Sequence, residues 1–258
     1  MTRSRWTRRQ FASAIGAASA GVWGIGCGTP AQPDGFGSAL LMTRPSQPTN
    51  PVGPGTYPLG LAPFRDGLLY VPPQAAPSVL LPLVVTLHGG GGTASSQIDF
   101  YRPDAQQRGY YLLAVEARGG TWDAINGRFS IDPPFIDQAL AYTFARCRVE
   151  PARIYLAGAS DGATYGLGLG LANGDMFRRL MMFFPGAIAP SDSPRLGKPE
   201  IFIAHGTNDT IFPVDRSRGV TVPALRGEGY VVEYLEFDGG HSVPPAVRQQ
   251  ALDWLARP

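Results

Sequence analysis

Residues 153–162 read RIYLAGASDG, an apolar run that leads into a Gly-x-Ser-x-Gly motif. We predict a buried strand over Arg153–Ala157 and a helix over Ala163–Asn173, so the motif lies on the turn between them. A sharp strand-to-helix turn forces strained backbone angles and exposes its central side chain, and glycines two residues before and after it prevent clashes across the turn. In this context we interpret Ser160 as a catalytic nucleophile.

The alternation of strand and helix patterns continues on both sides of this stretch. Further strands are predicted at Leu68–Val71, Leu81–Leu87, Tyr110–Val115, Leu180–Phe184, Glu200–His205 and Val231–Phe237. Further helices are predicted at Asp132–Cys147, with Asp132 as the N-cap, and around Val214–Gly227 and Pro245–Ala256. Strands that alternate with helices build a mostly parallel sheet covered on both faces, and such sheets bind ligands at the carboxyl ends of the strands. The sequence therefore predicts an α/β fold with its functional residues in these loops.

Two of these loops carry partners for a serine nucleophile. The loop HGTND holds Asp209, an acid that can orient an imidazole and stabilise it when charged. An Asx turn or helix cap is the alternative role for this aspartate, and Asp215 is the nearest rival acid. The loop DGGHS holds His241, the base that a serine hydroxyl needs near neutral pH. The order Ser160, Asp209, His241 is that of acyl hydrolases and differs from the orders of the two common serine-protease folds.

A glycine loop follows the predicted strand Leu81–Leu87. His88 is followed by four glycines, which let the backbone approach a substrate carbonyl. We predict an oxyanion hole made by the N–H groups of Gly90 and Asp161. A phosphate-binding loop is excluded because no Gly-Lys-Ser/Thr follows. We interpret His88 and His205 as structural, and because Cys and His do not cluster at ligand spacing, we predict no metal and no cofactor.

The motifs LHGGGG, GASDG, HGTND and GGH, in this order, resemble the α/β-hydrolase superfamily. They are similar in particular to small bacterial phospholipase/carboxylesterase-like serine esterases, with kinship to polyhydroxybutyrate-depolymerase-like and feruloyl-esterase-like enzymes. The resemblance covers about Gly67 to Pro258 and implies an α/β-hydrolase fold and a carboxylic ester hydrolase that works through an acyl-enzyme. It assigns Ser160, Asp209 and His241 as nucleophile, acid and base. The chain lacks the disulfide cysteines and appended binding domain of a typical depolymerase.

The substrate pocket is less well defined by the sequence. Trp122 and Tyr101, with Phe100 and Phe129, are aromatic candidates for its lining, and core packing is the alternative role for each. Asp123 and Asn126 are candidates for binding polar parts of a substrate. Superfamily members with a cap usually insert it after the strand that here ends near Phe184, but the stretch from Pro185 to Pro199 is too short for a lid domain. We therefore predict no cap domain and an open cleft for small-molecule esters.

Two other functions stay open at this point. A peptidase or an acyltransferase uses the same three residues, because the triad serves amides, esters and thioesters. A non-catalytic, surface-anchored binding protein on a hydrolase scaffold is the alternative from another class, although the intact set of residues argues against it.

The N-terminus predicts export. Arg8 and Arg9 form a twin-arginine pair, and the uncharged stretch 12–26 is too short to span a bilayer. The segment resembles a Tat signal, with an ordinary Sec signal as the alternative. Residues 24–27 (GIGC) resemble a lipoprotein processing site, so we predict that Cys27 is lipidated; cleavage by ordinary signal peptidase is the alternative. The predicted protein is periplasmic or cell-surface, held at the membrane only through Cys27, or otherwise secreted.

Composition predicts the domain boundaries and argues against nucleic acid as a partner. We divide the chain into an export signal (1–27), a Pro/Gly-rich tether (28–57) and a catalytic domain (58–258). Four of the 22 basic residues lie in the first nine positions, so a chain without residues 1–26 carries 18 basic and 20 acidic side chains, a net charge of −2. Such a charge gives no reason to expect nucleic-acid binding. We expect a monomer.

Overall fold

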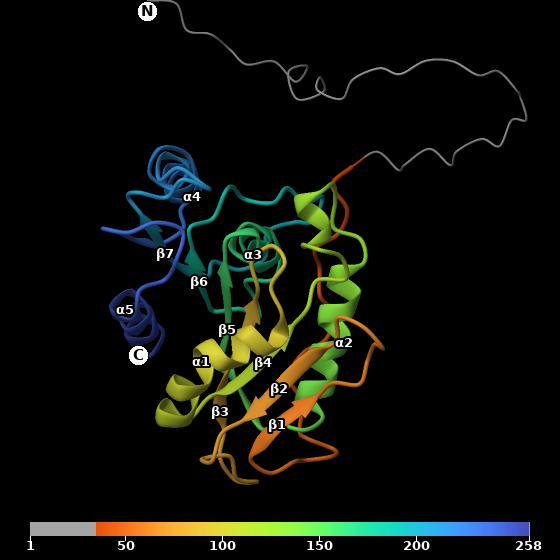
Figure 1. The fold of residues 1–258 in the computed structure, drawn as a ribbon. Helices are drawn as coiled ribbons and strands as arrows, with labels where there is room; N and C mark the ends of the chain where they lie inside the picture. Colours follow the sequence, from red (N-terminus) through yellow and green to blue (C-terminus); the bar gives the residue numbers. More distant parts are fainter. Residues whose placement is uncertain (1–34, 258) are drawn as a thin grey trace, which may run out of the picture. The chain divides into compact units, whose positions relative to one another are not determined.

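An eight-stranded sheet forms the centre of the computed structural model, which describes residues 35–257 (Figure 1). Its strands are β1 (Gly55–Pro58), β2 (Gly67–Val71), β3 (Leu81–Leu87), β4 (Tyr111–Val115), β5 (Val149–Ala159), β6 (Arg179–Phe183), β7 (Glu200–Gly206) and β8 (Val232–Phe237). They are ordered β1-β2-β4-β3-β5-β6-β7-β8. β1 and β2 run antiparallel to their neighbours, and the strands from β4 to β8 are all parallel. The predicted mostly parallel sheet is confirmed.

Helices cover both faces of this sheet. They are α1 (Ala94–Arg108), α2 (Asp132–Phe144), α3 (Asp161–Ala172), α4 (Val222–Gly227) and α5 (Pro245–Leu255), with a short 3-10 helix η1 (Asp123–Ile125) and a π-helical turn η2 (Ser217–Thr221). Residues of α2, α3 and α4 belong to one buried cluster, and residues of α1 and α5 to the other. Within residues 35–257, none of the helices has the length and apolar character needed to span a bilayer.

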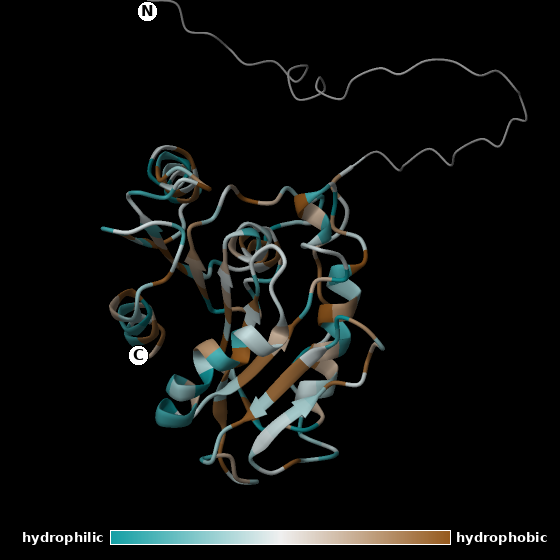
Figure 2. Cartoon of the chain, in the orientation of Figure 1, coloured by the Kyte–Doolittle hydropathy of each residue, from teal (hydrophilic) through white to brown (hydrophobic). Residues whose placement is uncertain are grey.

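The apolar strands follow from this double coverage. Every residue of β3 is buried, with Leu83 and Val85 in the cluster of α2 and α3 and Val84 in the cluster of α1 and α5. Successive side chains of a strand point to opposite faces, so a strand covered on both faces needs an unbroken apolar run. Figure 2 shows brown colour along β2, whereas the edge strand β1 is pale and several turns of α1 are teal.

The start of α2 differs from the sequence prediction. Asp132 is the first helical residue and not the N-cap. The Asp123 carboxylate supplies the acceptor instead, since its Oδ2 receives hydrogen bonds from the N–H groups of Ser130, Ile131 and Asp132 at 2.7, 2.7 and 3.0 Å. Asp132 in turn accepts from the N–H groups of Arg118 and Asp123, both at 2.6 Å, and burial raises the pKa of Asp132 to about 6. The two aspartates together fix the loop between β4 and α2.

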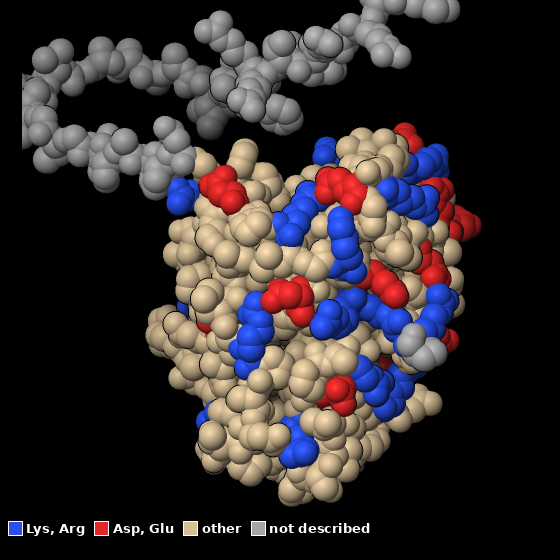
Figure 3. Space-filling view, turned by 180° about the vertical axis from the view of Figure 1, so that it is seen from behind, with Lys and Arg blue, Asp and Glu red and all other residues tan. Residues whose placement is uncertain are grey.

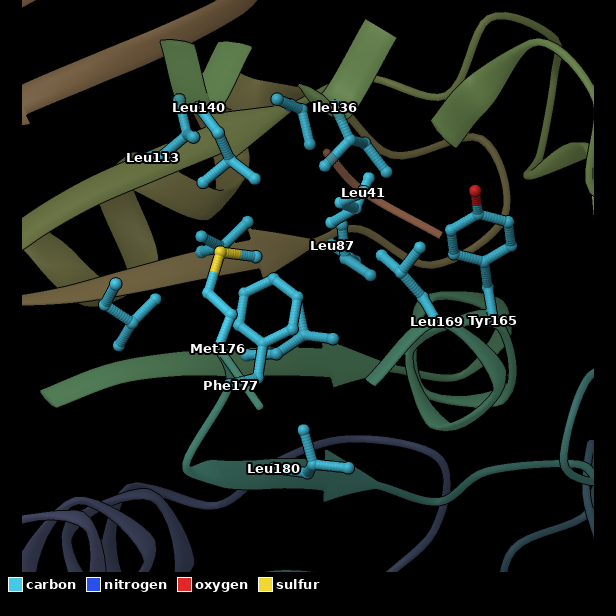
Figure 4. Packing of buried hydrophobic residues seen from close by; sticks show 14 of the residues in the cluster. Leu41, Leu87, Leu113, Ile136, Leu140, Tyr165, Leu169, Met176, Phe177 and Leu180 are labelled. Carbon is cyan, nitrogen blue, oxygen red and sulfur yellow. The ribbon is translucent and has the colours of Figure 1, made fainter. Parts of the chain in front are cut away.

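Residues 35–54, which we call the N-terminal strap, correct the predicted tether. Asn173 at the end of α3 holds the strap through its carboxamide, which donates to the Ala39 carbonyl at 2.7 Å and accepts from the Leu41 N–H at 2.8 Å. Figure 4 shows Leu41 beside Leu87 and Ile136, and its side chain is buried. The prediction of a tether over residues 28–57 is therefore wrong from residue 35 onward, and residues 28–34 lie outside the described residues.

The physical reason is that an extended Pro-rich chain has no internal hydrogen bonds. Its backbone groups are free to pair with distant partners, and composition does not reveal whether such partners exist. Here the Asp137 carboxylate on α2 accepts the N–H groups of Met42 and Thr43, both at 2.8 Å. The catalytic-domain boundary predicted at residue 58 is too late for the same reason.

Two further features concern the segment between β6 and β7 and the charged surface. Between β6 and β7, residues 184–199 form neither a helix nor a strand that could build a cap. On the face shown in Figure 3, basic and acidic side chains lie next to one another. Several charged side chains of the described residues form ion pairs, as Arg179 with Glu200 at 3.0 Å and Arg257 with Glu233 at 2.6 Å.

Candidate active site

The turn between β5 and α3 carries Ser160 in a strained conformation. Its φ of 57° and ψ of −123° fall in a region that a residue with a side chain rarely adopts. A Cβ on Gly158 would overlap the Gly162 carbonyl, and a Cβ on Gly162 would overlap the Leu87 carbonyl of β3. Glycine at 158 therefore lets the turn close on the start of α3, and glycine at 162 lets it pass this close to β3.

Three loops at the carboxyl ends of β5, β7 and β8 bring the predicted residues together. The Ser160 Oγ lies 2.8 Å from Nε2 of His241, and Nδ1 of His241 lies 2.7 Å from Oδ2 of Asp209. A Cβ on Gly206 would overlap the Gly239 carbonyl, so glycine at the end of β7 allows the loop with His241 to approach. The Asp209 side chain is buried, and that of His241 is 20% exposed. Ser160 and His241 are both half-buried and stay accessible to ligands, whereas Asp209 is closed off from solvent.

The environment of Asp209 keeps its carboxylate charged. Burial raises the pKa of Asp209, but hydrogen bonds from His241 and from the N–H groups of Phe212 and Ile211 outweigh it and hold the pKa below its usual value. The two N–H groups reach Oδ1 at 2.9 and 2.8 Å. A charged carboxylate only accepts hydrogen bonds, so the proton of the imidazole lies on Nδ1 and Nε2 presents its lone pair to Ser160.

The same carboxylate fills both roles that the sequence left open for Asp209. Oδ1 accepts the N–H two residues on, as an Asx turn does, while Oδ2 orients His241. Asp215, the rival acid, has a side chain that is 80% exposed and pairs with Arg218 at 3.5 Å. It takes no part in the cluster.

The glycine loop lies directly against Ser160. A Cβ on Gly89 would lie 3.3 Å from the Cβ of Ser160. The loop is closed by hydrogen bonds from the Gly91 N–H to the Gly120 carbonyl at 2.9 Å and from the Gly92 N–H to the Gly89 carbonyl at 3.0 Å. Among the described residues, no backbone hydrogen bond engages the N–H groups of Gly90 or Asp161. Both groups predicted for the oxyanion hole therefore belong to residues next to Ser160 or to the loop that contacts it, and they are available as donors.

Sequence reasoning missed the side chain of Asp161. Its Oδ2 accepts a hydrogen bond from Thr121 Oγ1 at 2.6 Å and would lie 2.8 Å from a Cβ placed on Gly90. The carboxylate thus lies next to the glycine loop and adds a negative charge at the edge of the predicted oxyanion hole. The acid at the second variable position of Gly-x-Ser-x-Gly was the available signal, although nothing in the sequence indicated Thr121 as its partner.

The aromatic residues proposed for the substrate pocket lie in the core. Trp122 is fully buried; its Nε1 donates to the His88 carbonyl at 2.8 Å, and its ring stacks on Tyr165 with centroids 4.9 Å apart. Tyr101 is buried in the cluster of α1 and α5, and Phe129 is buried beside Tyr165. The prediction that Trp122 and Tyr101 line a substrate pocket is wrong because both side chains are covered by packing. Trp122 instead holds the start of the glycine loop through the His88 carbonyl and packs against the His88 ring, with centroids 5.0 Å apart.

The other proposed ligands and His88 also have structural partners. The Asp123 carboxylate is engaged by the start of α2, and Phe100 on α1 packs against the guanidinium of Arg248 at 4.6 Å. His88 Nε2 accepts the Ala117 N–H at 3.0 Å, and burial lowers the pKa of His88. A neutral, hydrogen-bonded His88 agrees with its structural interpretation.

Two aromatic side chains that the sequence did not indicate lie against His241. The ring of Phe184, just after β6, lies 4.3 Å from the imidazole centroid to centroid, and Phe212 meets it edge-on at 5.5 Å. Phe184 also has a positive φ of 41°, a second strained residue in this region. The two rings limit the orientations open to the imidazole.

Comparisons with known proteins agree with this architecture. No protein-family model matches the chain, and no curated protein matches its sequence. Among solved structures, the chain is similar to esterase PE8, with 21% identity and a TM-score of 0.57 over 80% of this chain and 98% of that one.

Esterase 2 of Thermogutta terrifontis is similar as well. With butyrate bound, it has 18% identity and a TM-score of 0.58 over 78% of this chain and 91% of that one. Its structure phosphorylated by paraoxon has 17% identity and a TM-score of 0.57 over the same shares. Together with the strand order and helix layers, these likenesses show that the chain has the α/β-hydrolase fold.

Proposed function

We propose that the chain is a serine esterase that hydrolyses carboxylic esters through an acyl-enzyme. The observation that carries this proposal is the chain of contacts from Ser160 Oγ to His241 at 2.8 Å and from His241 to Asp209 at 2.7 Å, starting at a strained turn. A serine hydroxyl within hydrogen-bond reach of an oriented imidazole is the arrangement that activates a weak nucleophile.

The reaction proceeds in two halves. His241 takes the Ser160 proton at Nε2 while Oγ attacks the ester carbonyl, and the oxyanion accepts hydrogen bonds from the N–H groups of Gly90 and Asp161. The C–O bond to the alcohol breaks as His241 returns the proton to the leaving oxygen. Water then repeats these steps on the acyl-enzyme, releasing the carboxylic acid and free Ser160. Asp209 keeps the proton on Nδ1 and stabilises the imidazolium, without itself taking a proton.

Short-chain, dissolved esters are the proposed substrates. Residues 184–199 carry no helix that could close over the site, so a long acyl chain finds little enclosed apolar wall. Each methylene that stays in water forgoes up to about 0.8 kcal/mol of binding. The butyrate bound by the Thermogutta terrifontis esterase supports the same size class.

A panel of substrates tests the proposal. Purified protein should hydrolyse p-nitrophenyl acetate and butyrate, show no rate jump where a longer ester forms micelles, and lose essentially all activity on Ser160→Ala. Ser95→Ala, an exposed serine on α1, is the matched control and should leave the rate unchanged. Cleavage of peptides with no ester hydrolysis would favour the peptidase alternative. A folded wild-type protein inactive on every acyl substrate would favour the non-catalytic binding protein.

Export by a Tat-type signal and lipidation of Cys27 are part of the proposal and rest on the sequence alone, because residues 1–34 lie outside the described residues. Replacing Arg8 and Arg9 by lysine should leave the protein in the cytoplasm. Cys27→Ser should release it from the membrane fraction or block its processing. An intact mass without lipid on the wild-type protein would leave a periplasmic or secreted esterase.

A further inference from the structure

A second histidine, His205, contacts Asp209 as well, with its Nε2 3.3 Å from the same Oδ2 atom that His241 contacts. The side chain of His205 is fully buried, like that of Asp209, so no ligand reaches it from solvent. We infer that His205 is a positioning residue, which holds the Asp209 carboxylate in place for His241 through a hydrogen-bonded chain that begins at Ser217. This inference rests on the proposed esterase function and adds two residues to its machinery.

The contacts of His205 fix where its proton lies. Its Nε2 is 2.7 Å from the Phe212 carbonyl and 3.3 Å from Oδ2 of Asp209. Both oxygens can only accept, so Nε2 carries the hydrogen and donates to the carbonyl, with the carboxylate as a second, longer acceptor. Nδ1 lies 2.7 Å from Ser217 Oγ. Burial lowers the pKa of His205, so the ring is neutral, and the Ser217 hydroxyl donates to Nδ1.

Through these contacts His205 acts on both oxygens of Asp209. It approaches Oδ2 directly, the same atom that receives Nδ1–H of His241. It acts on Oδ1 through the turn, because the carbonyl that it holds belongs to Phe212, whose N–H donates to Oδ1 at 2.9 Å. The Phe212 ring in turn meets His241 edge-on. Loss of the imidazole would therefore release the turn, the carboxylate and one wall of the catalytic imidazole together.

Ser217 stands on an irregular piece of backbone. It begins the π-helical turn η2, and its side chain is fully buried. π-Helical turns are rare and occur frequently at functional sites, where they place a side chain that a regular helix would turn elsewhere. Here the turn places a hydroxyl on the remaining nitrogen of a buried imidazole, whose polar atoms must all find partners.

The charged groups around His205 are few and identified. Asp209 and His241 face it from the loops, and Glu236 of β8 is its partner in the register of β7 and β8. Glu236 is bound by Arg218 through two contacts of 2.7 and 2.6 Å, so its charge is balanced. On the β6 side the neighbour is the uncharged ring of Phe184, 6.3 Å away. The group that His205 can influence most is therefore Asp209.

The test compares variants that keep or remove the donor. His205→Leu should lower kcat/KM for p-nitrophenyl butyrate about 10- to 100-fold, the range for loss of a hydrogen bond to a charged group, with the loss in kcat and not in KM. A carboxylate that is no longer held in place stabilises the imidazolium less, so the acid limb of the kcat/KM profile should move to lower pH. His205→Gln keeps an N–H at similar reach and should recover most of the activity.

Ser217→Ala is the second arm, with Thr221→Val as its matched control. Thr221 is a buried hydroxyl residue on the same π-helical turn. Ser217→Ala should lower kcat and shift the acid limb in the same direction as His205→Leu, whereas Thr221→Val should do neither. Equal effects of these two variants, or a folded His205→Leu with the wild-type rate and profile, would overturn the inference.

A measurement without turnover keeps the outcome distinct from that of the proposed function. The Nδ1–H of His241, bound to a carboxylate, should give a low-field proton resonance in the wild-type protein, and Ser217→Ala should shift it while Thr221→Val does not. If the wild-type protein hydrolyses no ester, the proposed function fails, and this resonance still decides whether His205 acts on Asp209. An unshifted resonance in folded Ser217→Ala would count against the inference whatever the activity.

Discussion

Asp209→Asn changes one atom of the site and should abolish most of its activity. The amide can adopt two orientations. In one, its oxygen replaces Oδ1 and accepts the N–H groups of Ile211 and Phe212, which reach that atom at 2.8 and 2.9 Å. Its NH₂ group then faces Nδ1 of His241 and forces that nitrogen to accept. The imidazole proton must move to Nε2, and Ser160 meets a nitrogen that cannot take its proton.

The energies favour this unproductive orientation. Turning the amide around would point its NH₂ group at two backbone donors and leave both unsatisfied, at about 1–3 kcal/mol for each buried group. The productive tautomer is therefore suppressed. Loss of the productive tautomer in the serine-protease template costs about 10⁴ in turnover, or about 5 kcal/mol of transition-state stabilisation. We expect a loss of this size here.

The assay is kcat for p-nitrophenyl butyrate together with a thermal melt. Asp215→Asn makes the same chemical change six residues away on an exposed side chain and should leave kcat unchanged. Asp209→Asn should remain folded, because the amide keeps the two backbone hydrogen bonds. An Asp209→Asn protein that retains more than about a tenth of the wild-type kcat would refute the assignment, since such a loss corresponds to only about 1.4 kcal/mol.

Three further predictions concern the frame around the site. Gly162→Ala should remove most activity and lower the free energy of unfolding, measured by urea titration, by about 1–3 kcal/mol, because its Cβ would overlap the backbone of β3. Gly127→Ala, with nothing within 4 Å of the added Cβ, should change neither activity nor stability. Leu41→Ala should lower the free energy of unfolding by about 2–5 kcal/mol in the same titration. Met42→Ala, at a side chain that is 81% exposed, should leave it almost unchanged. A Leu41→Ala protein as stable as the wild type would show that residues 35–54 act as a tether after all. Asp132→Asn should change the pH dependence of stability. Burial raises the pKa of Asp132 from 3.8 to about 6, so the folded state holds this proton more tightly than the unfolded chain does. The protonated carboxyl therefore contributes about 3 kcal/mol to the free energy of unfolding below about pH 4, and this contribution is lost as the pH rises towards 6. The difference in unfolding free energy between the wild-type protein and Asp132→Asn, measured by urea titration at pH 4 to 7, should show this decline. A difference that does not change with pH would contradict the prediction.

The strands β2 to β8 could be predicted because their signal is local, whereas β1 (Gly55–Pro58) was missed because it lies at the sheet edge and has no buried residue. A strand buried on both faces needs an unbroken apolar run, and LPLVVTL at Leu81–Leu87 matches β3 at both ends. α1 could not be predicted in the same way. Its sequence is mostly polar and contains Pro103, and its start depends on the reciprocal hydrogen bonds of Thr93 and Ser96. The strap was missed because its stability comes from Asn173, more than a hundred residues away.

The residues of the candidate site also divide into those that local sequence patterns predicted and those that they did not. Ser160, Asp209 and His241 each follow a predicted strand, so their meeting could be expected from the geometry of parallel strands. The role of Trp122 could not, because a large aromatic residue is equally suited to a pocket wall and to the core. His205 was interpreted as structural because its contacts with Asp209 and Ser217 depend on how a loop and a π-helical turn fold back, which no sequence pattern specified.

The central claim is that Ser160 is a nucleophile activated by His241, and its most direct measurement is the site of covalent attack. An organophosphate such as paraoxon, which phosphorylates the Thermogutta terrifontis esterase, should inactivate the protein with one phosphoryl group per chain. Peptide mass spectrometry should locate that group on Ser160, and His241→Gln should react much more slowly although its serine is intact. A label recovered on another residue, or equal labelling of wild type and His241→Gln, would contradict the claim.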